Sequence, residues 1–265
     1  MQMQADFLAD LRTQLNGDAQ VQAAWLAGSF GCGNADRYSD IDLHLLLDDI
    51  ETFRNHAQAW LESLRPLVLY RLLFDGRMIN ALTDEGLRID IWLHDEAPPL
   101  DPAAVDVQLD RGGVLRLETL PATAPAPAQI AGTLLAQMEE FWRCIALLPT
   151  VIGRRELLVA FTGLNVELGL ITEILMAGYG VQRERGVKIL NPYLGDTRCA
   201  ELEAALQLNG LTVESLVIAN RALAEIVRTQ GPLIARRHGF VYPATLEKAV
   251  LRYVAHELHN LPWEE

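Results

Sequence analysis

The sequence predicts an α+β fold, with an N-terminal domain built on a mixed β-sheet and a second, all-α domain that forms a helical bundle. Residues 1–120 alternate short apolar runs with turn residues, a pattern typical of strands joined by tight connections. From residue 129 onward, apolar residues recur at helical spacing almost throughout. Between these regions, residues 121–127 (PATAPAP) form the clearest break in composition. We therefore expect a stiff linker over residues 121–128, between a domain over 1–120 and a helical domain over 129–265.

The first domain is expected to contain two helices, five strands and a glycine-rich turn. Residues 5–15 carry one apolar stripe and predict an amphipathic helix, and residues 51–64 predict another. The expected strands cover residues 21–27, 41–47, 67–73, 77–82 and 87–93. Short turns at residues 75–76 and 84–86 separate the last three strands, which favours antiparallel hairpins.

The second domain is expected to be helical, without an internal repeat. Its predicted helices cover residues 129–148, 154–178, 199–206, 213–229 and 243–260. No run in the chain is expected to reach the ~20 consecutive apolar residues that a membrane-spanning helix needs. The N-terminus also lacks the basic start and apolar stretch of a signal peptide. We therefore expect a cytoplasmic protein.

The chain is acidic, and its charge is unevenly distributed. Its 265 residues carry a formal net charge of −13, and residues 1–120 hold 20 acidic side chains against 9 basic ones. Such a balance repels phosphate backbones, so broad nucleic-acid binding is not expected, whereas a cationic small substrate would be attracted. The three cysteines, Cys32, Cys144 and Cys199, lack the paired spacing of a zinc cluster or a disulfide framework.

The most informative pattern is Gly28-Ser29, followed after ten residues by Asp40-Ile41-Asp42. Gly28 allows a sharp turn with room for a ligand, and Ser29 offers a backbone N–H and a hydroxyl to phosphate oxygens. Asp40 and Asp42 lie two residues apart at the start of a strand, so both carboxylates point to the same face, with their Cα atoms ~7 Å apart. Carboxylates together with phosphate oxygens are the ligands that Mg²⁺ prefers. The pattern therefore predicts metal-dependent chemistry on a nucleoside triphosphate.

A third carboxylate is expected from Asp90, an isolated acid in the apolar strand Leu87–Leu93. A buried carboxylate without a partner is costly, so Asp90 is predicted to coordinate metal or to accept the proton of an attacking hydroxyl. Asp84 and Asp95 are weaker candidates because both fall in predicted turns. Ser39 stands directly before Asp40, where its hydroxyl can orient the pair of acids.

These residues together resemble the nucleotidyltransferase superfamily typified by DNA polymerase beta and the antibiotic nucleotidyltransferases. The resemblance covers residues 21–93. Scattered further residues resemble the two-domain lincosamide nucleotidyltransferases, and aminoglycoside nucleotidyltransferases share the same layout. Those further residues are the stretch Tyr38-Ser39-Asp40-Ile41, the strand Leu67–Leu73 with Tyr70, the turn Asp110-Arg111-Gly112-Gly113, and Arg154 with Glu156.

The resemblance implies that AMP passes from ATP to a hydroxyl of a small antibiotic, most of all a lincosamide, and that pyrophosphate is released. Asp40 and Asp42 would hold two Mg²⁺ ions, and Asp90 would complete the metal site or act as a general base. Gly28, Ser29 and Ser39 would contact the nucleotide. The helical domain would add basic contacts to the triphosphate, and a homodimer is implied. The basic candidates are Arg154, Arg155, Arg183, Arg185 and Lys188, of which Lys188 and Arg154 are preferred.

Three alternatives stay open on the sequence alone. The acceptor can be an aminoglycoside instead of a lincosamide, since both are polyhydroxylated amines. It can also be a protein, although the long helical half favours a self-contained enzyme, and the acidic surface argues against RNA. The third alternative is a non-catalytic nucleotide-binding module. Such a module has no physical need for Asp40, Asp42 and Asp90 together.

Overall fold

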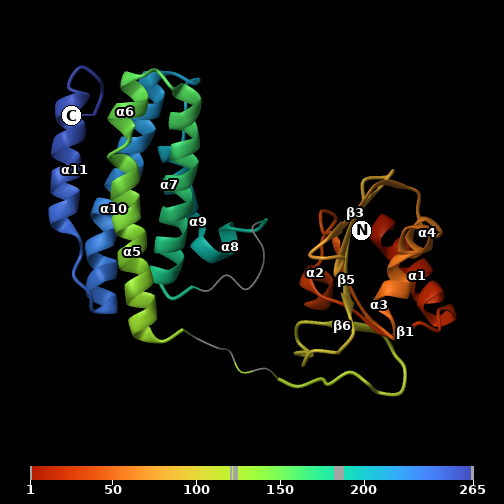
Figure 1. The fold of residues 1–265 in the computed structure, drawn as a ribbon. Helices are drawn as coiled ribbons and strands as arrows, with labels where there is room; N and C mark the ends of the chain where they lie inside the picture. Colours follow the sequence, from red (N-terminus) through yellow and green to blue (C-terminus); the bar gives the residue numbers. More distant parts are fainter. Residues whose placement is uncertain (1, 120, 122–124, 182–187, 264–265) are drawn as a thin grey trace. The chain divides into compact units, whose positions relative to one another are not determined.

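A computed structural model describes residues 2–119, 121, 125–181 and 188–263 of the chain (Figure 1). The chain divides into two compact units, Met1–Ala122 and Thr123–Glu265. The first unit is α+β and the second is helical.

The first unit is built on a six-stranded mixed sheet with the strand order β3-β4-β5-β2-β1-β6. The strands are β1 Val21–Leu26, β2 Ile41–Leu47, β3 Leu67–Leu73, β4 Met78–Thr83, β5 Arg88–His94 and β6 Asp106–Asp110. β2 and β5 are parallel, whereas the other neighbouring pairs are antiparallel. The expected hairpins β3–β4 and β4–β5 are therefore present, and the sheet is mixed because β5 adds to β2 in parallel.

Alternate residues of the central strands point into a core on one face of the sheet. Ile41, Leu43, Ile89 and Ile91 are fully buried there, against the apolar stripe of α1 (Gln2–Gly17), which includes Phe7. The short helices α3 (Ile50–Arg54) and α4 (Ala57–Glu62) cover the same face (Figure 1). Because strand side chains alternate, the residues between these apolar positions lie on the opposite face. That opposite face carries the candidate site.

Two elements of the first unit differ from the prediction. The helix expected over residues 51–64 is split into α3 and α4, because the backbone at His56 has ψ near 1° and leaves the helical conformation. β6 is not predicted, because its five residues DVQLD alternate only two apolar side chains, Val107 and Leu109, with three polar ones, which is a short and weak strand pattern. It is an edge strand that pairs only with β1 among the described residues, so it does not need a continuous apolar face.

The second unit is a bundle of helices packed around one apolar core. Its helices are α5 Pro127–Ile145, α6 Leu148–Gly153, α7 Leu157–Gly178, α8 Asn191–Leu194, α9 Asp196–Ala205, α10 Val213–His238 and α11 Ala244–Glu257. α5 begins within the segment expected to be a linker, because Pro127 occupies the first turn, where its missing N–H costs nothing. α10 continues past its expected end at residue 229, through Pro232, since Ile234 and Ala235 continue its buried stripe.

α7 corrects the expectation that no helix is long and apolar enough to span a membrane. Leu157–Gly178 meets that criterion by length and composition. One such helix is weak evidence, because the core helix of a bundle passes the same test. α7 indeed packs against α5 and α10, and its buried side chains include Leu164, Ile171 and Leu175.

Candidate active site

Three carboxylates meet on the face of the sheet opposite the helix-covered core. Asp42 of β2 and Asp90 of β5 are direct partners in the parallel register, and Asp40 stands two residues before Asp42 on the same face. One oxygen from each of the three lies within 4.8 Å of the others. All three side chains are half-buried. Within the described part of the chain, they form the one group of three or more acidic, histidine or cysteine side chains close enough to share a metal ion.

The strand order explains why residues far apart in the sequence come together. β5 follows β4 in a hairpin and pairs with β2 in parallel. The N-terminal parts of both strands, which carry Asp42 and Asp90, therefore lie side by side. The apolar neighbours Ile41, Leu43, Ile89 and Ile91 fix this orientation because they are fully buried on the other face. A shift of register by one residue would bury the acids and expose the core.

The donor set fits a hard divalent cation. All three ligands are carboxylate oxygens, which Mg²⁺ and Mn²⁺ prefer. Mg²⁺ binds oxygen at about 2.0–2.1 Å, so two oxygens on one ion are at most about 4.2 Å apart, somewhat less than the 4.8 Å within which the three carboxylates approach one another. Two ions about 3.5–4 Å apart, bridged by such carboxylates, would also fit oxygens within 4.8 Å of one another.

Gly28 makes the turn that brings the β1 end to the acids. It has a positive φ of 58°, and a Cβ atom at this position would lie 2.1 Å from Asp42 Oδ2. The backbone N–H of Ala27 donates a 2.9 Å hydrogen bond to the carbonyl of Asp42. The chain can therefore pass this close to the carboxylate only because residue 28 has no side chain.

Ser29 follows in α2 (Gly28–Gly31), a helix of only four residues. Its first helical hydrogen bond runs from the Gly31 N–H to the Ala27 carbonyl at 2.9 Å. The N–H of Ser29 therefore precedes the hydrogen-bond ladder of the helix, on the same side of Asp42 as Gly28. This is the place where the sequence predicts a phosphate, although α2 is too short for a substantial dipole.

Ser39 is engaged in the loop that leads into Asp40. Its hydroxyl accepts a 2.9 Å hydrogen bond from the Asp36 N–H and donates to Asp36 Oδ1 at 3.2 Å. The buried side chain of Gln4 donates to the Ser39 carbonyl at 3.3 Å. These bonds fix the backbone directly before Asp40, and they engage the Ser39 hydroxyl with Asp36, so a contact of that hydroxyl with the acids or the nucleotide stays a prediction.

Sequence reasoning did not find Asn80. Its side-chain amide donates a 2.7 Å hydrogen bond to Asp90 Oδ1, and it is the register partner of Asp90 on β4. Asn80 is a single amide in the apolar strand MINALT, as Asp90 is a single acid in its own strand. A polar residue in the middle of an otherwise apolar strand is the sequence signal by which Asn80 and Asp90 can be recognised.

A row of rings runs beside the acids on the same face. His44 and Trp92 are register partners two residues beyond Asp42 and Asp90, and His44 stacks on the buried Trp25 with ring centroids 5.2 Å apart. His44 Nδ1 and His94 Nε2 are 2.9 Å apart and share a hydrogen bond. Burial, with His94 as a smaller contribution, lowers the pKa of His44 to about 4. His44 is thus a neutral, packed histidine at neutral pH.

The predicted basic contacts belong to the helical unit. Arg154 is the exposed C-cap of α6, Arg155 is an exposed residue with a φ of 59°, and Lys188 is exposed before α8. Arg183 and Arg185 lie outside the described residues. A contact of any of these residues with the nucleotide stays a prediction.

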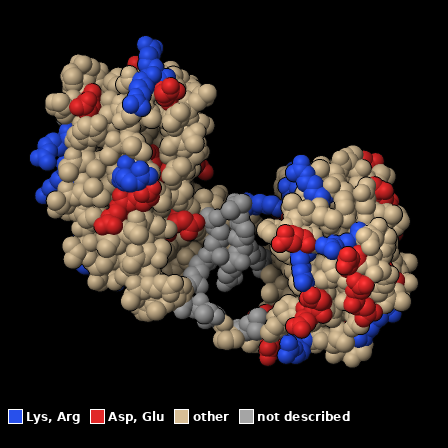
Figure 2. All heavy atoms as spheres, viewed as in Figure 1, with Lys and Arg blue, Asp and Glu red and all other residues tan. Residues whose placement is uncertain are grey.

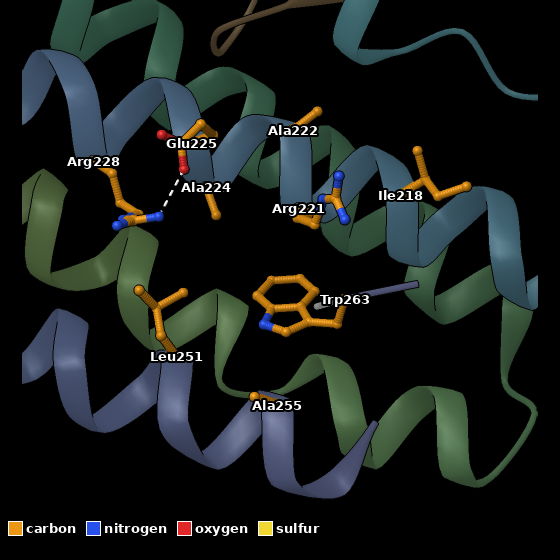
Figure 3. A pocket seen from close by; sticks show the side chains of 9 residues that line it. All are labelled: Ile218, Arg221, Ala222, Ala224, Glu225, Arg228, Leu251, Ala255 and Trp263. Carbon is orange, nitrogen blue, oxygen red and sulfur yellow. Dashed lines mark hydrogen bonds and ion pairs between the residues drawn. The ribbon is translucent and has the colours of Figure 1, made fainter. Parts of the chain in front are cut away.

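The helical unit also contains a pocket of about 660 Å³ on α10 and α11 (Figure 3). Trp263, Leu251 and Ala255 form its apolar side. Arg228 on its rim donates to Glu225 Oε2 at 2.8 Å and lies 3.7 Å from Glu247 Oε1. Because its charged groups largely neutralise one another, this pocket offers less to a triphosphate than the carboxylate site offers to a metal ion.

No protein-family model matches the chain, and no curated protein matches it. Among solved structures, the chain is similar to an aminoglycoside 6-adenyltransferase from Bacillus subtilis. The two are 17% identical, the match covers 96% of each chain, and the TM-score is 0.44. This is a distant likeness.

Proposed function

We propose that this protein is a nucleotidyltransferase that carries AMP from ATP to a hydroxyl of a small antibiotic in a Mg²⁺-dependent reaction. The single observation that supports this most is the approach of Asp40, Asp42 and Asp90 oxygens to within 4.8 Å. Gly28, packed against Asp42, brings the backbone turn after β1 directly beside these acids. A site that only binds nucleotide does not require three converging carboxylates.

The reaction forms a bond between the acceptor oxygen and the α-phosphorus and breaks the bond from that phosphorus to the β-phosphate oxygen. Asp40 and Asp42 would hold Mg²⁺, which when bound would neutralise charge on the phosphates and lower the pKa of the acceptor hydroxyl. Asp90, tied to Asn80, is the group that we assign to orient the acceptor hydroxyl and to take its proton. Gly28 and the N–H of Ser29 hold the phosphate chain, and pyrophosphate leaves.

We assign the acceptor to the lincosamides on the resemblance of the scattered residues, with aminoglycosides as the alternative. The excess of acidic residues in 1–120 suits an acceptor that carries an amine. Figure 2 shows acidic and basic side chains interleaved on the viewed face of the first unit, instead of the continuous basic surface that RNA or DNA would need. A homodimer and a cytoplasmic location belong to the same proposal, and analytical ultracentrifugation tests the former.

The test is a mass-spectrometric assay with Mg²⁺, ATP and a panel of lincosamides and aminoglycosides. The wild type is compared with Asp40→Ala and with a control, Asp84→Ala, which removes an exposed turn carboxylate. We expect one drug class to gain a single AMP with the wild type and the control, but not with Asp40→Ala. ATP·Mg²⁺ binding without modification of any drug would instead favour a protein acceptor or a binding module.

A further inference from the structure

The acid site continues across the sheet as a row of polar residues. Asp42 pairs with Asp90, Asp90 with Asn80, and Asn80 with Arg71 of β3. Register partners share a face, so Arg71 lies on the face of the acids. The packing agrees, because its neighbour Tyr70 is packed against the core on the opposite face.

Arg71 differs from most arginines of the first unit in having its guanidinium available. Arg65 is paired with Asp10, Arg77 with Asp95, and Arg88 with the carbonyl of Tyr38. The Arg71 side chain is exposed and has no hydrogen bond or ion pair with any residue that the structure describes. An exposed cation in line with three carboxylates is therefore free to meet a ligand seated over β4 and β5.

The row of polar residues that runs from Asp42 to Arg71 has different neighbours at its two ends. Gly28 and Ser29 adjoin Asp42 from the β1 side, whereas Asn80 and Arg71 extend from Asp90 on the β4 and β3 side. In phosphoryl and nucleotidyl transfer, the attacking and leaving oxygens lie roughly in line on opposite sides of phosphorus. If the pyrophosphate lies at Gly28-Ser29, the acceptor must approach over β5, β4 and β3. Adjacent strands are about 4.8 Å apart, so Arg71 is about 10 Å from Asp90 at Cα, which a long side chain can bridge.

We infer that Arg71 is a specificity-determining residue that binds the acceptor, and this inference rests on the proposed function. A guanidinium donates hydrogen bonds to the paired hydroxyls of a sugar ring and repels ammonium groups. The acceptor class is therefore a hydroxylated ring without an ammonium group beside the reacting hydroxyl. A polycation with amines around that hydroxyl is the poorer substrate.

The neighbouring row supports an amphipathic acceptor of this kind. Leu73, Met78, Trp92 and His44 form the next register row on the same face, about 7 Å along the strands. Phe74 is 65% exposed, adopts a φ of 51°, and stacks on Trp92 with ring centroids 5.3 Å apart. The left-handed conformations of Phe74 and Asp75 belong to the tight turn between β3 and β4, and this turn holds the Phe74 ring against Trp92. An acceptor with a hydroxylated ring over the first row can therefore place an apolar group over the second.

The experiment compares wild type, Arg71→Gln and Arg71→Glu with Arg12→Gln, which removes an exposed arginine from α1 on the other face. KM and kcat are measured for ATP and for two acceptors, a lincosamide with one amine and a polyamine aminoglycoside. Acceptor binding is also measured by calorimetry with a non-hydrolysable ATP analogue and Mg²⁺. We expect Arg71→Gln to raise the lincosamide KM and dissociation constant about tenfold or more, with the ATP KM unchanged. Arg71→Glu should shift the preference toward the polyamine.

The outcomes separate the two proposals. If wild type modifies no acceptor, the proposed function fails and the role of Arg71 fails with it. If wild type transfers AMP but the Arg71 variants match Arg12→Gln, the inference alone is overturned. A rise in the KM of ATP in place of the acceptor KM also overturns it, because Arg71 would then serve the nucleotide.

Discussion

Gly28 lies so close to Asp42 that a Cβ atom on residue 28 would stand 2.1 Å from Asp42 Oδ2. The next two nearest atoms, at 3.0 and 3.5 Å, also belong to the Asp42 side chain, so this side chain is what a substitution at residue 28 would displace first. Gly33 is a matched position in the same loop, with a φ of 68° and no atom within 4 Å of where its Cβ would be placed. Comparing substitutions at Gly28 and Gly33 therefore separates the cost of a left-handed backbone conformation from the cost of displacing the Asp42 carboxylate.

Gly28→Ala is expected to abolish most activity, whereas Gly33→Ala is expected to retain it. Both substitutions carry the left-handed penalty of about 1–2 kcal/mol, which lowers the melting temperature of each. Only Gly28→Ala pushes Asp42 aside, and a misplacement of about 1 Å at a reacting centre costs on the order of 100-fold in rate. Steady-state kinetics and calorimetry of both variants test this. Equal activity losses would show that the loop conformation, and not the carboxylate, is what matters.

Asn80→Ala should lower kcat about 10- to 100-fold, because a hydrogen bond to a charged group contributes about 1.5–3 kcal/mol. Without the 2.7 Å bond to Oδ1, the Asp90 carboxylate is free to rotate. The Mg²⁺ concentration needed for half-maximal activity should rise as well. Asn80→Asp should be at least as damaging, since it places a fourth carboxylate beside the other three. Asn16→Ala, at the exposed end of α1, is the control and should behave as wild type.

Mg²⁺ or Mn²⁺ should raise the melting temperature of the wild type in the absence of nucleotide. A ligand that binds only the folded state stabilises it by mass action. Asp42→Asn should lose this rise while being no less stable than wild type without metal, because it relieves repulsion among three carboxylates within 4.8 Å. Differential scanning fluorimetry over a metal titration measures both effects. An equal rise in Asp42→Asn would place the stabilising ion elsewhere.

The acids are predictable from the sequence, whereas their nearest partner is not. Asp40, Asp42 and Asp90 stand out because isolated charges interrupt apolar strands, and alternation alone puts Asp40 and Asp42 on one face. Nothing local tells that β5 adds in parallel to β2, which is what brings Asp90 to Asp42. The roles of Asn80 and Arg71 depend on two further strand pairings and follow only from the register.

The helices and strands, too, are predictable only where the local sequence pattern decides them. Strands β2 and β3 occupy the predicted residues because each is mostly apolar, interrupted by Asp42 and His44 in β2 and by Arg71 in β3. The polar edge strand β6 and the passage of α10 through Pro232 depend on tertiary pairing and packing, which override local propensity.

Glu167 should make the stability of the helical unit fall as pH rises. Its side chain on α7 is only 3% exposed, and its Oε2 has no hydrogen-bond partner among the described residues. Burial raises the pKa of this carboxyl from 4.5 to about 8. Between these values, the unfolded chain has released the proton that the folded chain retains, so the free energy of unfolding decreases by up to about 1.4 kcal/mol per pH unit.

Glu167→Gln should remove this dependence. The amide is neutral at every pH, so the variant should match wild type near pH 5 and exceed it at pH 8 by a few kcal/mol. Urea unfolding followed by circular dichroism at several pH values gives the difference between the two proteins. Glu139→Gln, at an exposed position on α5, should leave the wild-type slope unchanged. A wild-type slope in Glu167→Gln as well would mean that other groups cause the dependence.

Gly231→Ala should destabilise the helical unit, although alanine is normally the better helix former. A Cβ atom on Gly231 of α10 would lie 2.4 Å from Tyr242 Cε2. Tyr242 cannot move away easily, because its hydroxyl accepts a 3.0 Å hydrogen bond from Trp142 Nε1 and donates one of 2.6 Å to Glu247. We expect a loss of about 1–3 kcal/mol, the usual cost of overpacking.

Gly169→Ala on α7 is the matched comparison and should have the opposite sign. Gly169 is also inside a helix, but it is exposed and has no atom within 4 Å of where a Cβ would be placed. Only helix propensity then acts, so the substitution should stabilise the unit by about 0.5–1 kcal/mol. Urea unfolding of both variants against wild type measures the two effects. If both substitutions are stabilising, Tyr242 can leave its place, and the hydrogen bonds from Trp142 and to Glu247 do not hold the junction of α10 and α11.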